Sequence, residues 1–142
     1  MILGKLLNIQ NNDIEKSIKL SINTVNEELD GLNPEQTCLI YSSYIYRNLK
    51  KMNINTRMIN TLDLGFNYEH FFNLVPDNNS FYLIDLTFSQ FNNEQMPNLL
   101  KNGYQIINDN EFNKYLDIVT QDHIKDFSLN DVYIGLKSMG GR

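Results

Sequence analysis

Three residues of this chain have the types needed for nucleophilic catalysis: Cys38, which is the only cysteine, His70 and Asp85. A free thiol has a pKa of about 8.5 and is mostly protonated at neutral pH. A helix N-terminus and a nearby imidazolium both favour the thiolate, which can attack a carbonyl carbon and form a thioester. A carboxylate can hold the imidazole in one tautomer and stabilise its charged form. The three residue types therefore predict a thiol nucleophile, its base and an orienting acid.

Cys38 lies in the segment "NPEQTCLIYSSYIYRNLKKM", which predicts a helix over residues 33–52. Asn33 is a favourable N-cap, Pro34 suits the first helical position, and Gln36 follows the cap by three residues. The apolar residues recur at helical spacing and predict one buried stripe with Cys38 at its head. These residues are Tyr41, Ile45, Leu49 and Met52.

His70 and Asp85 lie in two segments that predict neighbouring strands, 68–75 and 81–88, with turn residues at 76–80 between them. A third strand is predicted over residues 54–62, and the short connections favour an antiparallel sheet. Counting back from a turn centred near residues 77–78, position 70 pairs with position 85. Directly opposed side chains lie about 4.5–5.5 Å apart at Cβ, so imidazole and carboxylate are expected side by side.

The remaining pattern predicts a single α+β domain over residues 1–142. A helix is expected over 12–29, capped by Asn12 or Asp13 and ended at Gly31. After the three strands we expect a short helix over 96–103 closed by Gly103, an extended segment over 104–107, a helix over 108–127 and a last strand over 132–136. In this fold the Cys38 helix packs on the antiparallel sheet that carries His70 and Asp85.

Each candidate residue also has a non-catalytic interpretation. Cys38 can be a small buried apolar residue, because free cysteine is among the most buried residue types. Gln36 can be a capping-box partner instead of a donor to an oxyanion. The backbone N–H of Cys38 can also donate to an oxyanion. His70 alone can be a core histidine and Asp85 a strand-end acid, although a lone acid inside "YLIDLTF" is costly. We expect His123 to be a solvated helix residue and Asn73 to face solvent.

Composition excludes several other classes of protein. Charged residues make up 20% of the chain and its net charge is −5, with no basic cluster beyond Lys50 and Lys51, which argues against a nucleic-acid surface. One cysteine excludes an internal disulfide and a cysteine-built zinc site, and two histidines give little support to any metal site. No apolar run is long enough to span a membrane. The start lacks a signal-peptide pattern, so we expect a cytoplasmic protein, with export by a signal-independent route left open.

The order helix Cys, strand His, strand Asp resembles the transglutaminase-like branch of the papain-like thiol enzymes. "EHFFNLV" is similar to that family's His strand, in which an aromatic residue, here Phe72, stands two residues after the histidine. "NSFYLIDLTFSQF" resembles its Asp strand, of the type "W/F-Y-L-I/V-D-P-T", and the resemblance covers residues 33–91. The chain departs from the family pattern at Leu86, where proline is common, and at Thr37 and Leu39, where small residues are usual.

The resemblance implies a cysteine-dependent amide hydrolase or acyl transferase that acts on a protein or peptide through a thioester, without a cofactor. It makes Cys38 the nucleophile, His70 the base and Asp85 the orienting acid, with Gln36 and Phe72 near the oxyanion or substrate. Water as acceptor gives a peptidase or a glutamine deamidase, and a lysine amine gives a transglutaminase. Such a domain suits a bacterial peptide-processing protease or an effector-type deamidase. The alternative is a non-catalytic protein-binding module on the same fold, and the oligomeric state stays open.

Overall fold

The computed structural model describes residues 2–33, 37–91 and 96–138, with side chains described between residues 14 and 135. In these ranges the chain forms four α-helices, two short 3-10 helices and one four-stranded antiparallel sheet of order β1-β2-β3-β4. The α+β class is confirmed. In chain order the elements are α1 (Ile2–Glu28), α2 (Cys38–Lys51), β1 (Arg57–Asn60), η1 (Thr61–Leu64), β2 (Phe71–Asp77), β3 (Ser80–Ile84), η2 (Phe88–Gln90), β4 (Tyr104–Ile107), α3 (Asp109–Thr120) and α4 (Leu129–Ser138).

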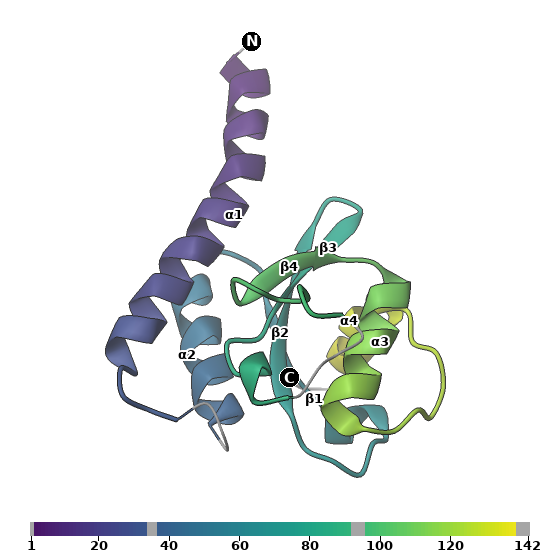
Figure 1. The fold of residues 1–142 in the computed structure, drawn as a ribbon. Helices are drawn as coiled ribbons and strands as arrows, with labels where there is room; N and C mark the ends of the chain where they lie inside the picture. The colour runs from purple at the N-terminus through teal and green to yellow at the C-terminus, as the bar shows by residue number, and fades with distance from the viewer. Residues whose placement is uncertain (1, 34–36, 92–95, 139–142) are drawn as a thin grey trace.

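Helices cover both faces of the sheet. Helices α1 and α2 lie against one face, helices α3 and α4 lie against the other, and the N-terminal turns of α1 project beyond the sheet (Figure 1). Two buried apolar clusters match these layers: one joins α1 and α2 to Val75, Tyr82 and Ile84, and the other joins α3 and α4 to Phe72, Leu74 and Leu83. Because side chains alternate along a strand, β2 and β3 each supply both clusters.

The register of the central hairpin differs by two residues from the predicted one. Asn73 pairs with Ile84 and Asp77 with Ser80, so only Asn78 and Asn79 connect the strands, and Pro76 lies inside β2 and not in the turn. Position 85 is therefore opposite position 72, and His70 lies two residues further along. An even offset keeps both side chains on the same face, so the error changes their distance along the strand and not their side of the sheet.

Helix α2 begins four residues later than predicted, with its N-cap at Thr37 and not at Asn33. Its first residue is Cys38 and its N-cap is Thr37, which makes no side-chain capping bond; the Thr37 hydroxyl instead donates to the carbonyl of Asn33 at 2.7 Å. Pro34 and Gln36 lie outside the described residues. The buried stripe is confirmed at Tyr41, Ile45 and Leu49. The later start places the thiol at the first helical position, where the helix dipole acts most strongly.

The two terminal helices also differ from the predictions. Helix α1 extends to Ile2, so Asn12 and Asp13 are interior positions and not caps. The predicted strand over 132–136 is part of α4, because the hydroxyl of Ser128 accepts from the N–H of Asp131 at 3.2 Å and the buried Leu129 and Val132 recur at helical spacing. These two signals outweigh the strand propensity of Val132 and its neighbours.

The segment around α3 was predicted in part. Asn108 caps α3 in a capping box with Glu111, but the helix ends at Thr120 because Gln121 adopts a left-handed conformation with φ 55°. Residues 104–107 form β4, as expected. The described part of 96–103 is a series of turns and not a helix, closed by Gly103 with φ +88°.

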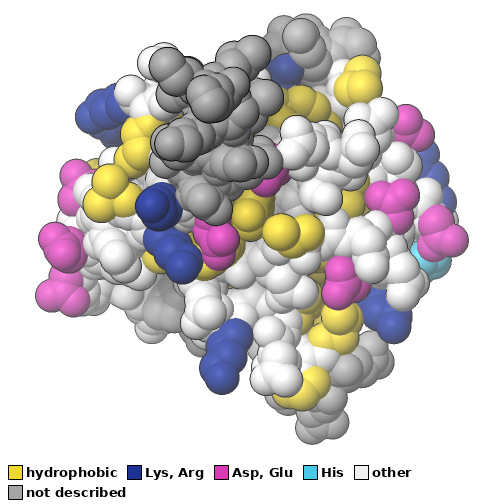
Figure 2. All heavy atoms as spheres, turned by 90° about the horizontal axis from the view of Figure 1, so that it is seen from above, with side chains coloured by type: hydrophobic (Ala, Val, Ile, Leu, Met, Phe, Trp, Pro, Cys, Tyr) yellow, Lys and Arg dark blue, Asp and Glu magenta, His cyan; other side chains and the backbone are white. Residues whose placement is uncertain are grey.

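The surface seen in Figure 2 carries acidic and basic side chains interspersed over the same face. None of the helices in the described residues is long and apolar enough to cross a membrane. The expectation of no membrane span is consistent with this finding.

The carbonyl of Gly103 accepts a hydrogen bond from the backbone N–H of Asp85, which directly follows β3. Replacing Gly103 should destabilise the fold. A Cβ at Gly103 would lie 2.5 Å from Cδ2 of Leu86, and the φ of +88° disfavours any L residue. Gly31 has a similar φ of +89° with nothing within 4 Å, so Gly31→Ala measures the backbone cost alone. We expect Gly103→Ala to lower the free energy of unfolding by about 1 kcal/mol more than Gly31→Ala, since the end of the Leu86 side chain must move. Urea denaturation of both variants tests this, and equal losses would contradict it.

Candidate active site

The structure brings His70 and Asp85 into direct contact. Nε2 of His70 lies 2.7 Å from Oδ2 of Asp85, and the two side chains are each 1% exposed. His70 directly precedes β2 and Asp85 directly follows β3, so both residues lie just beyond the paired strands at one end of the hairpin. The diagonal placement spans about 7–8 Å between backbones, which an imidazole can bridge. The predicted pair is thus present, although the predicted register is not.

Asp85 accepts hydrogen bonds at both carboxylate oxygens. Oδ1 accepts from the backbone N–H and from the hydroxyl of Thr87, both at 3.0 Å. Oδ2 accepts from the hydroxyl of Tyr115 at 2.6 Å as well as from His70. A carboxylate offers about four lone-pair sites, so these four donors saturate it. The backbone N–H of Asp85 in turn donates to the carbonyl of Gly103 at 2.9 Å, which fixes the position of the acid.

The backbone and ring of His70 are both held in place. Its N–H donates to the hydroxyl of the buried Thr61 at 2.9 Å, and its carbonyl accepts from the N–H of Thr61 at 3.0 Å. The same Thr61 hydroxyl donates to the carbonyl of Tyr68. Phe91 meets the imidazole edge-on, with ring centroids 5.0 Å apart. With Nε2 engaged by Asp85, the ring leaves Nδ1 for a partner on the other side.

Cys38 lies at the first position of α2, and its thiol is half-buried. The thiol lies close enough to the His70 side chain and to the backbone of Phe71 for both to act on its pKa. Burial alone raises the pKa of the Cys38 thiol, but the stabilisation of the thiolate by His70 and by the backbone of Phe71 outweighs burial, so the pKa lies below its ordinary value. The helix start favours the thiolate in the same direction.

The pKa of the His70 imidazole shifts in the opposite direction. Burial alone lowers the pKa of His70, but the hydrogen bond with Asp85 and then the nearby thiol of Cys38 raise it from 6.5 to about 9. A thiol with a lowered pKa next to an imidazole with a raised pKa favours a thiolate–imidazolium pair. Of the residues chosen from the sequence, His70 and Asp85 are in direct contact, and Cys38 lies near enough to act on the imidazole.

Helix α2 is attached to the sheet through Asn73, which is buried and does not face solvent as predicted. Its Nδ2 donates to the carbonyl of Ser42 in α2 at 3.2 Å. Val75, on the same face of β2, lies in the apolar cluster formed by α1 and α2. This packing and the Asn73 bond together fix the height of α2 on the sheet, and with it the position of Cys38.

Of the two other predicted site residues, Phe72 does not have the expected place and Gln36 is not among the described residues. Phe72 is fully buried and packs against Tyr115 and Phe112 with centroids 5.2 and 6.0 Å apart, so it belongs to the core and has no surface to offer a substrate. Gln36, the predicted oxyanion donor, lies outside the described residues.

Sequence reasoning missed Tyr115, Thr87 and Thr61 as parts of the site. Thr87 was detectable, because a threonine two residues after an aspartate is well placed to donate back to its carboxylate. Tyr115 was not, since its contact with Asp85 spans 30 residues and depends on how α3 docks. Thr61 was hidden because the predicted strand ran on through it, whereas the chain turns into η1 there.

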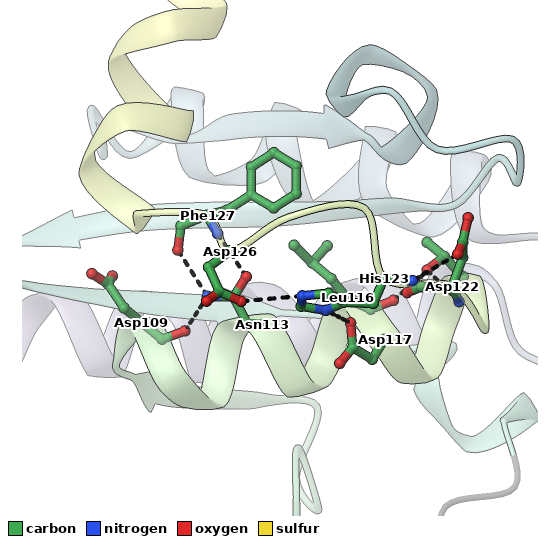
Figure 3. Close-up of polar contacts among 9 residues, drawn as sticks. Asp109, Asn113, Leu116, Asp117, Asp122, His123, Asp126 and Phe127 are labelled. Atoms are coloured by element: carbon green, nitrogen blue, oxygen red, sulfur yellow. Dashed lines mark hydrogen bonds and ion pairs between the residues drawn. The ribbon is translucent and has the colours of Figure 1, made fainter.

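The second histidine, His123, has a different environment from His70. It is exposed in the loop after α3, not within a helix as predicted, and its ring lies 2.8 Å from Asp117 and 3.2 Å from Asp126 (Figure 3). Its hydrogen bond with Asp117 raises its pKa above the usual value. His123–Asp117 is therefore a solvated counterpart of the buried His70–Asp85 pair. Among the side chains that the structure describes, no group of three or more His, Cys, Asp or Glu residues is placed to hold a metal ion.

Comparison with protein-family models, curated proteins and solved structures finds no match to this chain. The chemistry of the site is therefore argued from its own geometry. The features that carry it are the position of Cys38 at a helix start and the saturated His70–Asp85 pair.

The activated thiol predicts a characteristic alkylation profile. We expect Cys38 to react with iodoacetamide through a midpoint below that of an ordinary free thiol, because its pKa is lowered. In His70→Ala the midpoint should rise to about 8.5, and the rate at pH 6.5 should fall about tenfold or more as the thiolate fraction drops. Intact mass measures the reaction without ambiguity, since the chain has one cysteine.

The matched control for this experiment is His123→Ala, which removes the exposed histidine of a similar His–Asp pair. It should leave the profile of Cys38 unchanged. A thiol that reacts only above pH 8, with no difference between His70→Ala and wild type, would contradict the activated pair.

Proposed function

We propose that this protein is a cysteine-dependent amide hydrolase or acyl transferase that acts on a protein or peptide through a thioester on Cys38. The observation that carries the proposal is the buried hydrogen-bonded pair of His70 and Asp85, with a thiol at a helix start near enough to act on the imidazole. A buried, saturated carboxylate facing one imidazole nitrogen is the arrangement that an acid–base histidine needs.

In the first half of the reaction, the thiolate of Cys38 attacks the carbonyl carbon of the amide. The new S–C bond forms as the C=O π electrons move to oxygen, which gives a tetrahedral oxyanion. When the oxyanion collapses, the C–N bond breaks and the imidazolium of His70 gives its proton to the leaving nitrogen. An amine or ammonia departs, and the acyl group remains on sulfur as a thioester.

The first turn of α2 supports the developing oxyanion. The backbone N–H groups at a helix start have no partner within the helix, and Cys38 is the first residue of α2. Its N–H is therefore directed to the end of the helix where an oxyanion next to the sulfur would lie. The positive end of the helix dipole adds to this stabilisation.

In the second half, neutral His70 takes a proton from the acceptor, which attacks the thioester carbonyl and releases the thiolate. Water yields a carboxylic acid and completes hydrolysis of a peptide bond or a glutamine side chain. A lysine amine yields a new amide instead. The same three residues serve each outcome, so the acceptor and the substrate surface decide the reaction.

The order of residues and elements also supports the resemblance to the transglutaminase-like branch of the papain-like enzymes. A helix begins with the cysteine, the histidine opens one strand of an antiparallel sheet, and the aspartate closes the next. Thr37, Leu39 and Leu86 depart from that pattern, and Leu39 is 47% exposed beside the nucleophile. The substrate surface of this chain accordingly has its own character, and we assign the reaction type to the wider class alone.

The proposal is tested by looking for the thioester itself. The protein is incubated with peptidyl aminomethylcoumarins, and separately with glutamine peptides with and without a dansylated primary amine. We expect an acyl adduct on Cys38 after acid quench, seen by intact mass, together with coumarin, ammonia or dansyl-peptide release that identifies the acceptor. His70→Ala should slow acylation by about 10²–10⁴-fold, the usual contribution of a general acid–base.

Cys38→Ser and His123→Ala are the matched controls. The first should abolish the adduct in every arm, and the second should behave as wild type, because His123 is exposed and pairs with other carboxylates. If no arm gives Cys38-dependent product, and a lysate supplies no covalent adduct either, the binding-module alternative is favoured. Mass spectrometry of an adduct trapped from lysate would identify the substrate.

A further inference from the structure

Tyr115 reaches the candidate site from the helix layer opposite to the one that carries Cys38. It lies in α3, its side chain is fully buried, and its hydroxyl donates to Oδ2 of Asp85 at 2.6 Å. The same oxygen accepts from Nε2 of His70 at 2.7 Å. One carboxylate oxygen thus holds both the imidazole and a neutral phenol.

A buried tyrosine hydroxyl needs an acceptor for stability alone, so the bond by itself is no sign of function. What sets Tyr115 apart is the acceptor it uses. Other acceptors satisfy tyrosine hydroxyls in this chain without touching the site: Tyr104 donates to Oε2 of Glu15 at 2.7 Å on the α1 side of the sheet. Tyr115 instead shares the one oxygen that faces the imidazole.

Sharing an oxygen changes what His70 experiences. A hydrogen bond to a carboxylate stabilises its negative charge and leaves less of that charge for a second donor. Among the described residues, the titratable groups that interact with the imidazole are Cys38 from α2 and Asp85 from the end of β3, while Tyr115 from α3 acts on Asp85. Removing the phenol hydroxyl would leave the full charge of Oδ2 to His70 and hold its proton more tightly.

We propose that Tyr115 is a positioning residue that limits how strongly Asp85 retains the proton of His70. This inference rests on the proposed function, in which the imidazolium must give that proton to the leaving nitrogen. With the hydroxyl present, Asp85 orients the ring while the proton remains transferable. Without it, the thiolate–imidazolium pair is more stable and the acid is weaker.

The test is a titration of the two histidines by NMR in protein labelled with carbon-13 at histidine Cε1. His123→Gln assigns the signals, because the chain has only His70 and His123. In wild type we expect His70 to titrate near the value of about 9. In Tyr115→Phe, which keeps the ring and removes the hydroxyl, it should titrate about one pH unit higher, the size expected for one hydrogen bond to a charged group. The change in the Cys38 alkylation rate that accompanies loss of the His70 proton should move to higher pH by the same amount.

Tyr104→Phe is the matched control, since it removes an equivalent phenol–carboxylate hydrogen bond away from the site. It should leave the His70 titration unchanged. An unshifted His70 in folded Tyr115→Phe overturns the inference, because the hydroxyl then only satisfies the core. A Tyr115→Phe protein that does not fold, beside a Tyr104→Phe protein that does, overturns it for the same reason.

The titration also separates this inference from the proposed function, because it requires no substrate. A wild-type His70 that titrates at its ordinary value, with an unreactive thiol, overturns both. A wild-type His70 that is raised as expected, with no response to Tyr115→Phe, removes the role of Tyr115 and leaves the proposed function standing.

Discussion

The buried pair of His70 and Asp85 is the constraint around which the rest of the structure is arranged. Removing a carboxylate and an imidazole from water is costly unless every lone pair and proton finds a partner. Here the partners come from separate segments: Thr87 follows the acid, Thr61 holds the histidine backbone, and α3 supplies Tyr115. The chain thus meets the desolvation cost with hydrogen bonds that also fix the orientation of the imidazole.

Sequence patterns were sufficient for the parts of this arrangement that depend on local chemistry. The apolar stripe of α2 and the strand character of the β2–β3 hairpin follow from spacing and residue type, and the structure has both. The candidate residues came from their chemical types and from the helix and strands that carry them, and the cost of an isolated acid in an apolar strand favoured a partner for Asp85.

The parts that failed depend on tertiary packing. The hairpin register was missed because Pro76 was taken as turn residue, whereas it pairs with Phe81 within the ladder. The segment at 132–136 has strand propensity, but a cap at Ser128 and a buried helical face decide its structure. Contacts such as that of Tyr115 with Asp85 join residues 30 positions apart and follow only from how two layers meet across the sheet.

Because Tyr115 lies late in the chain, the set of hydrogen-bond donors around Asp85 is completed late in synthesis. Cys38, His70 and Asp85 leave the ribosome before Tyr115 does, so a nascent chain can hold all three without the helix that completes the carboxylate's set of donors. An acid lacking a buried donor is poorly tolerated in an apolar interior. The buried carboxylate therefore has its full set of donors only once α3 has docked on the sheet.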